Sequence, residues 1–277
     1  MDLIELMRNE FARSKNTLRW VFYLSAAIYL LALGDVFITN TIFSILTAII
    51  GILGQIIIAI LRVLSGKYYG SGEGIRRLAI LHDGLGITPS RLELARIFGQ
   101  ASGKAPREHP YVGPYYESSL PKGSKRLVEM LVESSFFTTY LAKKASLFFA
   151  AISGVGIIIV GFILFVTLQM SLSQQAATFI AQVITSTILF WLSTDIATMA
   201  WKYFKLSQIA EKISRHGSSL LEQTIDPSES SALILLNEYN CSVVEAPPIP
   251  SLIYKQYQDR LNTAWNSRKM DSSKKKV

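Results

Sequence analysis

Basic and tyrosine side chains are concentrated in the central polar stretch of the chain, residues 62–146, where they could bind an anionic ligand. Guanidinium and ammonium groups pair with phosphate, and tyrosine rings stack on bases, so a nucleotide is one ligand of suitable chemistry. The residues that we single out for this role are Arg76, Arg77, Tyr115, Tyr116, Lys125 and Arg126. The general excess of basic residues on the cytoplasmic side of membrane proteins would give the same composition without any pocket.

A glycine-rich sequence, GSGEG at residues 70–74, directly precedes Arg76 and Arg77. Backbone amides at such a turn could hold a phosphate group. The other interpretation is a flexible joint just below the membrane, and we favour it because glycine is a common breaker of regular structure.

The chain lacks the sequence patterns of common catalytic and metal sites. It has no HExxH, GxSxG or Walker A motif and no paired Cys/His set with zinc spacing. The histidines His82, His109 and His216 are scattered, and Cys241 is the only cysteine, so no intramolecular disulfide can form. We therefore expect no enzyme activity, no metal and no cofactor.

Four apolar stretches must position these polar segments. Half of the 277 residues are apolar, 17% are charged and the mean hydropathy is +0.31, whereas about a quarter of the residues in a soluble domain are charged. The stretches are residues 20–38, 41–61, 147–168 and 176–201, each close to the roughly 20 residues that cross a bilayer as a helix. Short connections within each pair predict an all-α membrane protein with two transmembrane hairpins.

The basic residues predict the orientation of these hairpins. Of the 28 Lys and Arg residues, four precede the first stretch, thirteen lie in 62–146 and eleven follow residue 201, so neither hairpin turn carries one. Because Lys and Arg gather on the cytoplasmic side, we expect both termini and the central segment to be cytoplasmic in a bacterial inner membrane. A cleaved signal peptide over residues 20–34 is the alternative, but acidic residues precede it and a second apolar stretch follows almost at once.

Small and polar residues form stripes on two predicted membrane helices. At 100° per residue, the second helix carries Ser44, Thr47, Gly51 and Gln55 on one face with Arg62 at its cytoplasmic end, and the fourth carries Thr178, Gln182, Thr185 and Ser193. Such stripes either pack against other helices or line a water-filled path. A chain with four spans has little room for a pore, so conduction would require a homo-oligomer.

Asp195 is the one acidic residue well inside a predicted span. A buried charge in a membrane helix is costly, and it normally faces another protein surface. We favour a structural role for Asp195 over a gate or a proton site.

The sequence predicts six segments. Residues 1–19 form a cytoplasmic N-terminal segment, 20–61 the first hairpin, 62–146 a cytoplasmic helical insert, 147–201 the second hairpin, 202–268 a cytoplasmic helical tail and 269–277 a disordered basic end. We expect helices capped by Thr88 and Asp226. We also expect a helix that begins at Ser124 and continues unbroken into the third span, and a fourth span that continues unbroken to Gly217.

Three short motifs resemble the SMODS-associating four-transmembrane effector family of bacterial anti-phage systems. They are HDGLGI at 82–87, ESSFFTTYLAKKA at 133–145 and NEYNCSVVEAPPIPSLIYKQYQDRLNTAW at 237–265. The chain departs from the family at GLGITPS, residues 84–90, where the family often has an acidic and aromatic sequence with Leu-Pro-Trp. The resemblance is therefore to a divergent branch, and no particular sensed ligand carries over.

The resemblance implies a membrane effector of the CBASS type. In such systems a partner enzyme detects infection and makes a cyclic oligonucleotide, and the effector then assembles and breaches the inner membrane. A DNA or RNA polymer is not an expected partner. Two other functions remain open on the residues alone: a non-conducting adaptor that recruits partners through its cytoplasmic helices, and a small channel or transporter.

Overall fold

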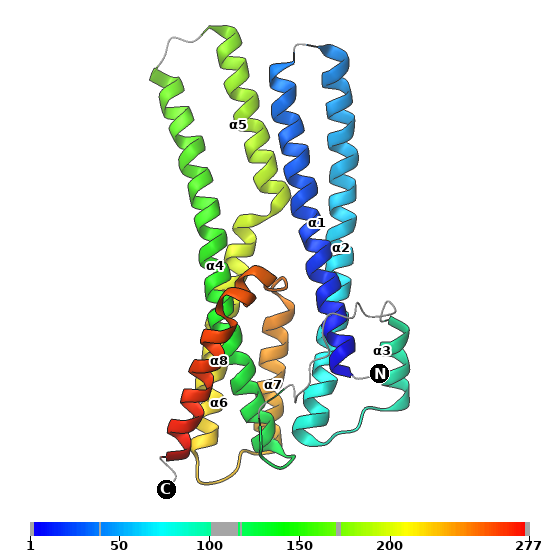
Figure 1. Ribbon diagram of the computed structural model, residues 1–277, viewed down its shortest axis with the longest axis vertical. Coiled ribbons are helices and arrows are strands. Elements are labelled where there is room, and N and C mark those ends of the chain that lie inside the picture. The colour runs from blue at the N-terminus through cyan, green and yellow to red at the C-terminus, as the bar shows by residue number, and fades with distance from the viewer. Residues whose placement is uncertain (1–2, 39, 101–115, 117, 170–172, 275–277) are drawn as a thin grey trace. The chain divides into compact units, whose positions relative to one another are not determined.

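The structure is a computed structural model that describes residues 3–38, 40–100, 116, 118–169 and 173–274. All regular secondary structure in these ranges is helical, which confirms the predicted all-α class (Figure 1). The helices are α1 (Leu3–Phe37), α2 (Thr41–Leu85), α3 (Arg91–Gln100), α4 (Ser124–Gln169), α5 (Gln174–Thr194), α6 (Ile196–Glu222), α7 (Glu229–Val244) and α8 (Ser251–Lys274).

Four helical segments are long and apolar enough to cross a membrane, as the sequence predicts. They lie within Leu3–Phe37, Thr41–Leu85, Ser124–Thr167 and Gln174–Glu222, the last of which covers both α5 and α6. The helix that begins at Ser124 continues without interruption into the third apolar stretch, as expected.

The chain divides into two compact units, which we describe separately. The apolar unit comprises Asn16–Gly66 and Leu147–Trp201, and the polar unit comprises Met1–Lys15, Lys67–Ser146 and Lys202–Val277. Helices α1, α2 and α4 each contribute residues to both units.

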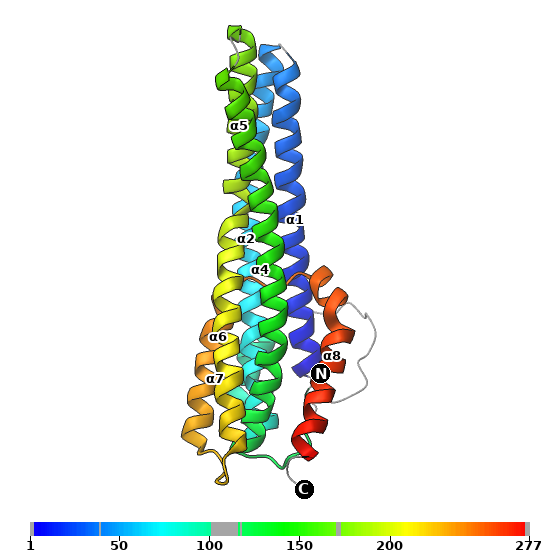
Figure 2. The same ribbon diagram turned by 90° about the vertical axis from the view of Figure 1, so that its left-hand side faces the viewer.

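In the apolar unit, α1 contacts each of the other helices. Ile28 packs on Gly54 of α2, where an added Cβ would lie 2.3 Å from the Ile28 side chain. Phe22 stacks on Phe149 of α4 with ring centroids 6.3 Å apart. The Tyr29 hydroxyl lies 3.0 Å from Thr187 Oγ1 of α5. These contacts run along α1, which is seen beside α2 and α5 in Figure 1 and in front of α2 in Figure 2.

Close packing between α4 and α5 occurs at one glycine of α4, Gly156. A Cβ at Gly156 would lie 2.0 Å from the Trp191 ring, whereas Gly154 and Gly161 have nothing within 4 Å. The indole ring therefore takes the space that the missing side chain leaves on α4.

The fourth apolar stretch is interrupted at Asp195, which corrects the predicted unbroken helix. Asp195 has φ 56° and ψ 29°, in the left-handed region that aspartate tolerates better than most residues with side chains. Its backbone N–H donates to the Trp191 carbonyl at 3.1 Å and ends α5, and its own carbonyl accepts from Met199 in the first turn of α6. The predicted intramembrane acid thus occupies a break between two helices.

The polar unit has its core along the first half of α4. Leu127, Val128, Met130 and Leu131 are fully buried there, as are Ile75 and Ile80 of α2, Tyr203 and Ile213 of α6 and Leu235 of α7. Gly217 brings α6 close to this core, because a Cβ at that position would lie 2.6 Å from Val132 and 3.2 Å from Leu235.

Serines, and not the residues that we predicted, cap two helices of the polar unit. Ser90 Oγ accepts from the Glu93 N–H, and the Glu93 carboxylate accepts from the Ser90 N–H, which forms a capping box for α3 in place of Thr88. These hydrogen bonds to the Ser90 backbone and side chain lower the pKa of Glu93. Ser228 caps α7 in place of Asp226.

Two further expectations about helix ends are wrong. The GSGEG sequence is neither a joint nor a phosphate loop, because α2 runs through residues 70–74 and ends at Leu85, with Gly86 in the left-handed region at φ 79°. Phe11 packs against Gly72, so the glycine serves contact between helices. At the C-terminus, α8 extends past residue 268 to Lys274, in a stretch without glycine or proline to stop it.

Candidate functional site

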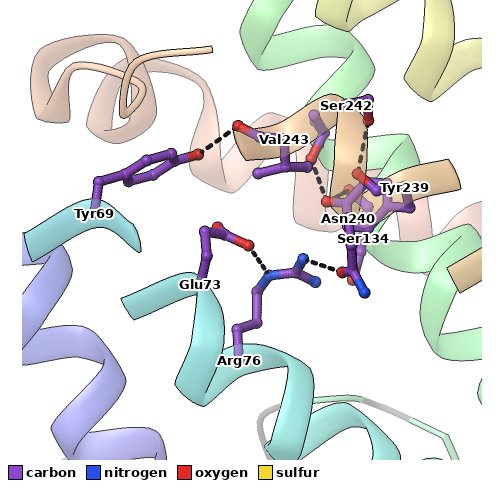
Figure 3. Close-up of polar contacts among 9 residues, drawn as sticks. Tyr69, Glu73, Arg76, Ser134, Tyr239, Asn240, Ser242 and Val243 are labelled. Carbon is purple, nitrogen blue, oxygen red and sulfur yellow. Dashed lines mark hydrogen bonds and ion pairs between the residues drawn. The ribbon is translucent and has the colours of Figure 1, made fainter. Parts of the chain in front are cut away.

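A buried arginine at the centre of the polar unit joins two distant parts of the chain. Arg76 Nε donates to Glu73 Oε2 at 2.7 Å, and Arg76 Nη2 donates to Asn240 Oδ1 at 2.8 Å (Figure 3). The exposed fractions of Glu73, Arg76 and Asn240 are 3%, 6% and 7%, so water contributes little to their solvation. This arginine network links α2 to α7 across 164 residues of sequence.

A tyrosine ring lies against the guanidinium. The Arg76 guanidinium lies 4.9 Å from the centroid of the Tyr239 ring, a distance that allows a cation–π interaction. The Tyr239 hydroxyl lies 2.7 Å from Thr138 Oγ1 and donates to the Ser134 carbonyl at 3.4 Å, which adds α4 to the network. About two turns before Arg76, the Tyr69 hydroxyl donates to the Val243 carbonyl at 3.1 Å, a second connection from α2 to α7.

The pKa values of Arg76 and of the buried tyrosines near it are all raised. Burial opposes the charge of Arg76, but Glu73 and the neighbouring tyrosines outweigh it and raise the Arg76 pKa. Burial raises the pKa of Tyr116 to about 12. Burial also raises the pKa of Tyr239, although Arg76 opposes the shift. These shifts favour the charged form of Arg76 and the protonated form of the two tyrosines.

This arrangement suits a structural connection better than a catalytic centre. The Arg76 charge is compensated by Glu73, and its second donor is used by the Asn240 amide. Among the described residues, no group of three His, Cys, Asp or Glu side chains could hold a metal ion. An ion pair this deeply buried is costly to break, because the partner left behind remains in a medium of low polarity.

The predicted ligand-binding residues fall in different places. Tyr116 is buried next to Arg76, and Tyr115 lies outside the described residues. Lys125 pairs with Asp226 at 2.6 Å. Arg126 pairs with Asp83 at 2.8 Å and also donates to two backbone carbonyls of the preceding loop. Arg77 is half-buried on α2.

Sequence reasoning did not find Glu73, Tyr239 or Asn240 as partners of Arg76. The spacing of Glu73 and Arg76 is that of neighbours on one helix face. It would have indicated the ion pair if GSGEG had been interpreted as helical. Asn240 lies in the NEYN motif quoted for the family resemblance, but nothing in the sequence pairs it with Arg76.

The predicted polar stripes of the apolar unit differ in how far they are covered. On α2, Ser44, Thr47 and Gly51 are half-buried, Ser44 donates to the Asp35 carboxylate at 2.9 Å, and Arg62 is also half-buried. The side chain of Gln55 is exposed. On α5, Thr178, Gln182 and Thr185 are exposed, and the side chain of Ser193 is outside those described. The amides of Gln55 and Gln182 are thus directed away from the packing of the apolar unit.

No protein family model matches the chain, and no curated protein or solved structure does either.

Removing the buried arginine should destabilise the polar unit strongly. We expect Arg76→Met to lower the free energy of unfolding by about 3–5 kcal/mol, because Glu73 would remain buried without a counter-charge. The Glu73→Met, Arg76→Met double variant should recover part of this loss. Lys205→Met, which removes one partner of the exposed pair with Glu245, is the matched control and should have little effect. Thermal unfolding of the solubilised protein measures all of these, and an Arg76→Met variant as stable as the wild type would contradict the account.

The buried tyrosines predict a loss of stability at alkaline pH. An unfolded chain ionises its tyrosines near pH 10, whereas folded Tyr116 stays neutral to about pH 12. Above about pH 10 the folded state therefore binds more protons than the unfolded state, because the unfolded tyrosines have lost theirs. The free energy of unfolding should then fall as the pH rises above about 10. The decline should be shallower in Tyr116→Phe, Tyr239→Phe protein, and chemical unfolding at several pH values tests this; equal slopes would show that neither tyrosine contributes.

Proposed function

We propose that the chain is a signal-gated membrane effector that oligomerises and permeabilises the bacterial inner membrane. In this proposal the apolar unit supplies four transmembrane helices as two hairpins. Both termini and the polar unit are cytoplasmic, which agrees with the absence of Lys and Arg from the two connections within the hairpins.

The observation that carries the proposal is the continuity of α2 and α4. Helix α2 has 45 residues and α4 has 46, and each supplies both a membrane-spanning length and buried residues of the polar unit. Arg76 and Glu73 lie on α2, and Thr138 and Ser134 lie on α4. A signal that changes the packing around the arginine network would therefore act on the same helices that cross the membrane, and packed units respond by switching between arrangements.

Exposed amides on α2 and α5 support assembly into a homo-oligomer. Gln55 and Gln182 lie in apolar helices and face away from the unit's own packing. In lipid a glutamine amide has no hydrogen-bond partner, so another protein surface or water must satisfy it. Copies of the same chain supply such a surface, and the amides can then join helices or line a water-filled path.

The role in anti-phage defence is proposed on the sequence resemblance. A cyclic oligonucleotide made by a partner enzyme would be the activating ligand, and a partner sensor protein is the other source of the signal. The chain would act without catalysis, and membrane disruption would stop the growth of the infected cell.

A non-conducting adaptor is the second candidate, favoured by one surface of α7. Leu233 and Ile234 are exposed there beside Glu229 and Glu238, which together line a shallow hollow. Apolar residues flanked by carboxylates suit a basic amphipathic helix of a partner.

Dye release from liposomes that contain the full-length protein tests the leading proposal. We expect release with one member of a panel of cyclic di- and trinucleotides. Gln55→Leu and Gln182→Leu should each reduce release by about three- to eighteenfold, since an interhelical hydrogen bond in a membrane contributes about 0.6–1.7 kcal/mol. Gln174→Leu, at the exposed start of α5, is the matched control and should release dye like the wild type.

The other outcomes discriminate between the candidates. Release without any nucleotide would contradict gating by these ligands but retain permeabilisation. If the Gln55→Leu and Gln182→Leu variants release as much dye as the wild type, the amides are not part of the water-filled path. Absence of dye release from protein shown to be inserted in the liposomes would contradict the effector proposal and favour the adaptor.

A further inference from the structure

Contacts within the apolar unit show which residues of different helices lie at one level. Ile28 of α1 packs on Gly54 of α2, and the two helices run in opposite directions, so Trp20 lies level with Arg62. Phe22 stacks on Phe149 of α4, which runs parallel to α1, and this places Trp20 level with Leu147. Gly156 of α4 packs on Trp191 of α5, and Trp201 follows ten residues later in α6, past the break at Asp195.

This common level coincides with one border of the apolar region. From Trp20 to Phe37, the end of α1, the helix rises about 26 Å at 1.5 Å per residue. The hydrocarbon core of a bilayer is about 30 Å thick. Trp20 and Trp201 are 57% and 65% exposed, so both indoles point outward at this border. Exposed tryptophans at such a depth are typical of the membrane–water interface.

The charges at the same level have one sign. Within five residues of Trp20, Arg62, Leu147 or Trp201 along each helix, the chain has eight Lys or Arg residues and no Asp or Glu. Several of these cations are engaged within the protein: Lys205 pairs with Glu245, and Lys144 lies over the Tyr257 ring. Arg19 and Lys202 are exposed, and each is the direct neighbour of one of the two exposed tryptophans.

We propose that Arg19, Trp20, Trp201 and Lys202 form a basic and aromatic border that binds the headgroups of anionic phospholipids in the cytoplasmic leaflet. The indoles occupy the headgroup level, and the neighbouring guanidinium and ammonium groups pair with lipid phosphates. This inference rests on the proposed membrane location and orientation. It adds a lipid preference, of phosphatidylglycerol over zwitterionic phosphatidylcholine, that the proposed function does not require.

Fluorescence quenching by brominated lipids tests the preference on the full-length protein. The protein is reconstituted in phosphatidylcholine vesicles that contain a minor fraction of either brominated phosphatidylglycerol or brominated phosphatidylcholine. Trp265 is buried and Trp191 is half-buried, so the exposed Trp20 and Trp201 should dominate the quenching. We expect the anionic quencher to be more effective. The preference for the anionic over the zwitterionic quencher should fall about fivefold for each cation removed in Arg19→Gln, Lys202→Gln protein.

Two controls keep the result interpretable. Lys255→Gln, Arg260→Gln protein loses the same charge from exposed positions of α8 and should keep the wild-type preference. Should the first double variant fail to fold, raising the salt concentration to about 1 M, where the Debye length is about 3 Å, should weaken the preference of the wild type instead.

Equal quenching by both lipids, or a preference unchanged in Arg19→Gln, Lys202→Gln protein, would overturn the proposed lipid site while leaving the membrane location intact. Absence of quenching by either lipid would contradict the membrane location itself, and with it the proposed function.

Discussion

The exclusion of basic residues from four lengths of apolar helix is the constraint on which the rest of the structure depends. Apart from the break at Asp195, the backbone in these lengths is hydrogen-bonded within each helix, as a bilayer requires, and most of the large exposed side chains are isoleucine, leucine, valine and phenylalanine. All 28 basic residues lie outside the four stretches. The polar side chains that remain inside them, such as Gln55 and Gln182, are therefore the positions where the apolar unit needs a partner.

The polar unit follows a different constraint, which is the cost of a buried charge. Glu73 and Arg76 can be buried because each neutralises the other and Asn240 takes a further hydrogen bond. This requirement holds α7 against α2, and the tyrosine hydroxyls extend the connection to α4. Since α2 and α4 also supply membrane-spanning lengths, the proposed signal would act where the polar unit is most sensitive to a change in packing.

The sequence was a good guide where one physical requirement decides the outcome. Four spans could be predicted because crossing a bilayer needs a fixed length of apolar helix, and Ser124 could be predicted to begin an uninterrupted helix. Local details that depend on competing groups were less predictable. Thr88 and Asp226 are residues of types that commonly cap helices, but Ser90 and Ser228, each two residues later, are the caps of α3 and α7. The arginine network could not be predicted, because the Asn240 partner of Arg76 is distant in sequence and GSGEG resembles a helix breaker.

The central claim, that the polar unit is cytoplasmic and the hairpin turns face outward, is tested most directly by cysteine labelling in spheroplasts. Cys241 is exposed on α7 of the polar unit, so a membrane-impermeant maleimide should react with it only after permeabilisation. Gln175 is exposed in the first turn of α5, and the Gln175→Cys, Cys241→Ser variant should be labelled in intact spheroplasts. Labelling of Cys241 in intact spheroplasts, with the Gln175→Cys, Cys241→Ser variant protected until permeabilisation, would contradict the account.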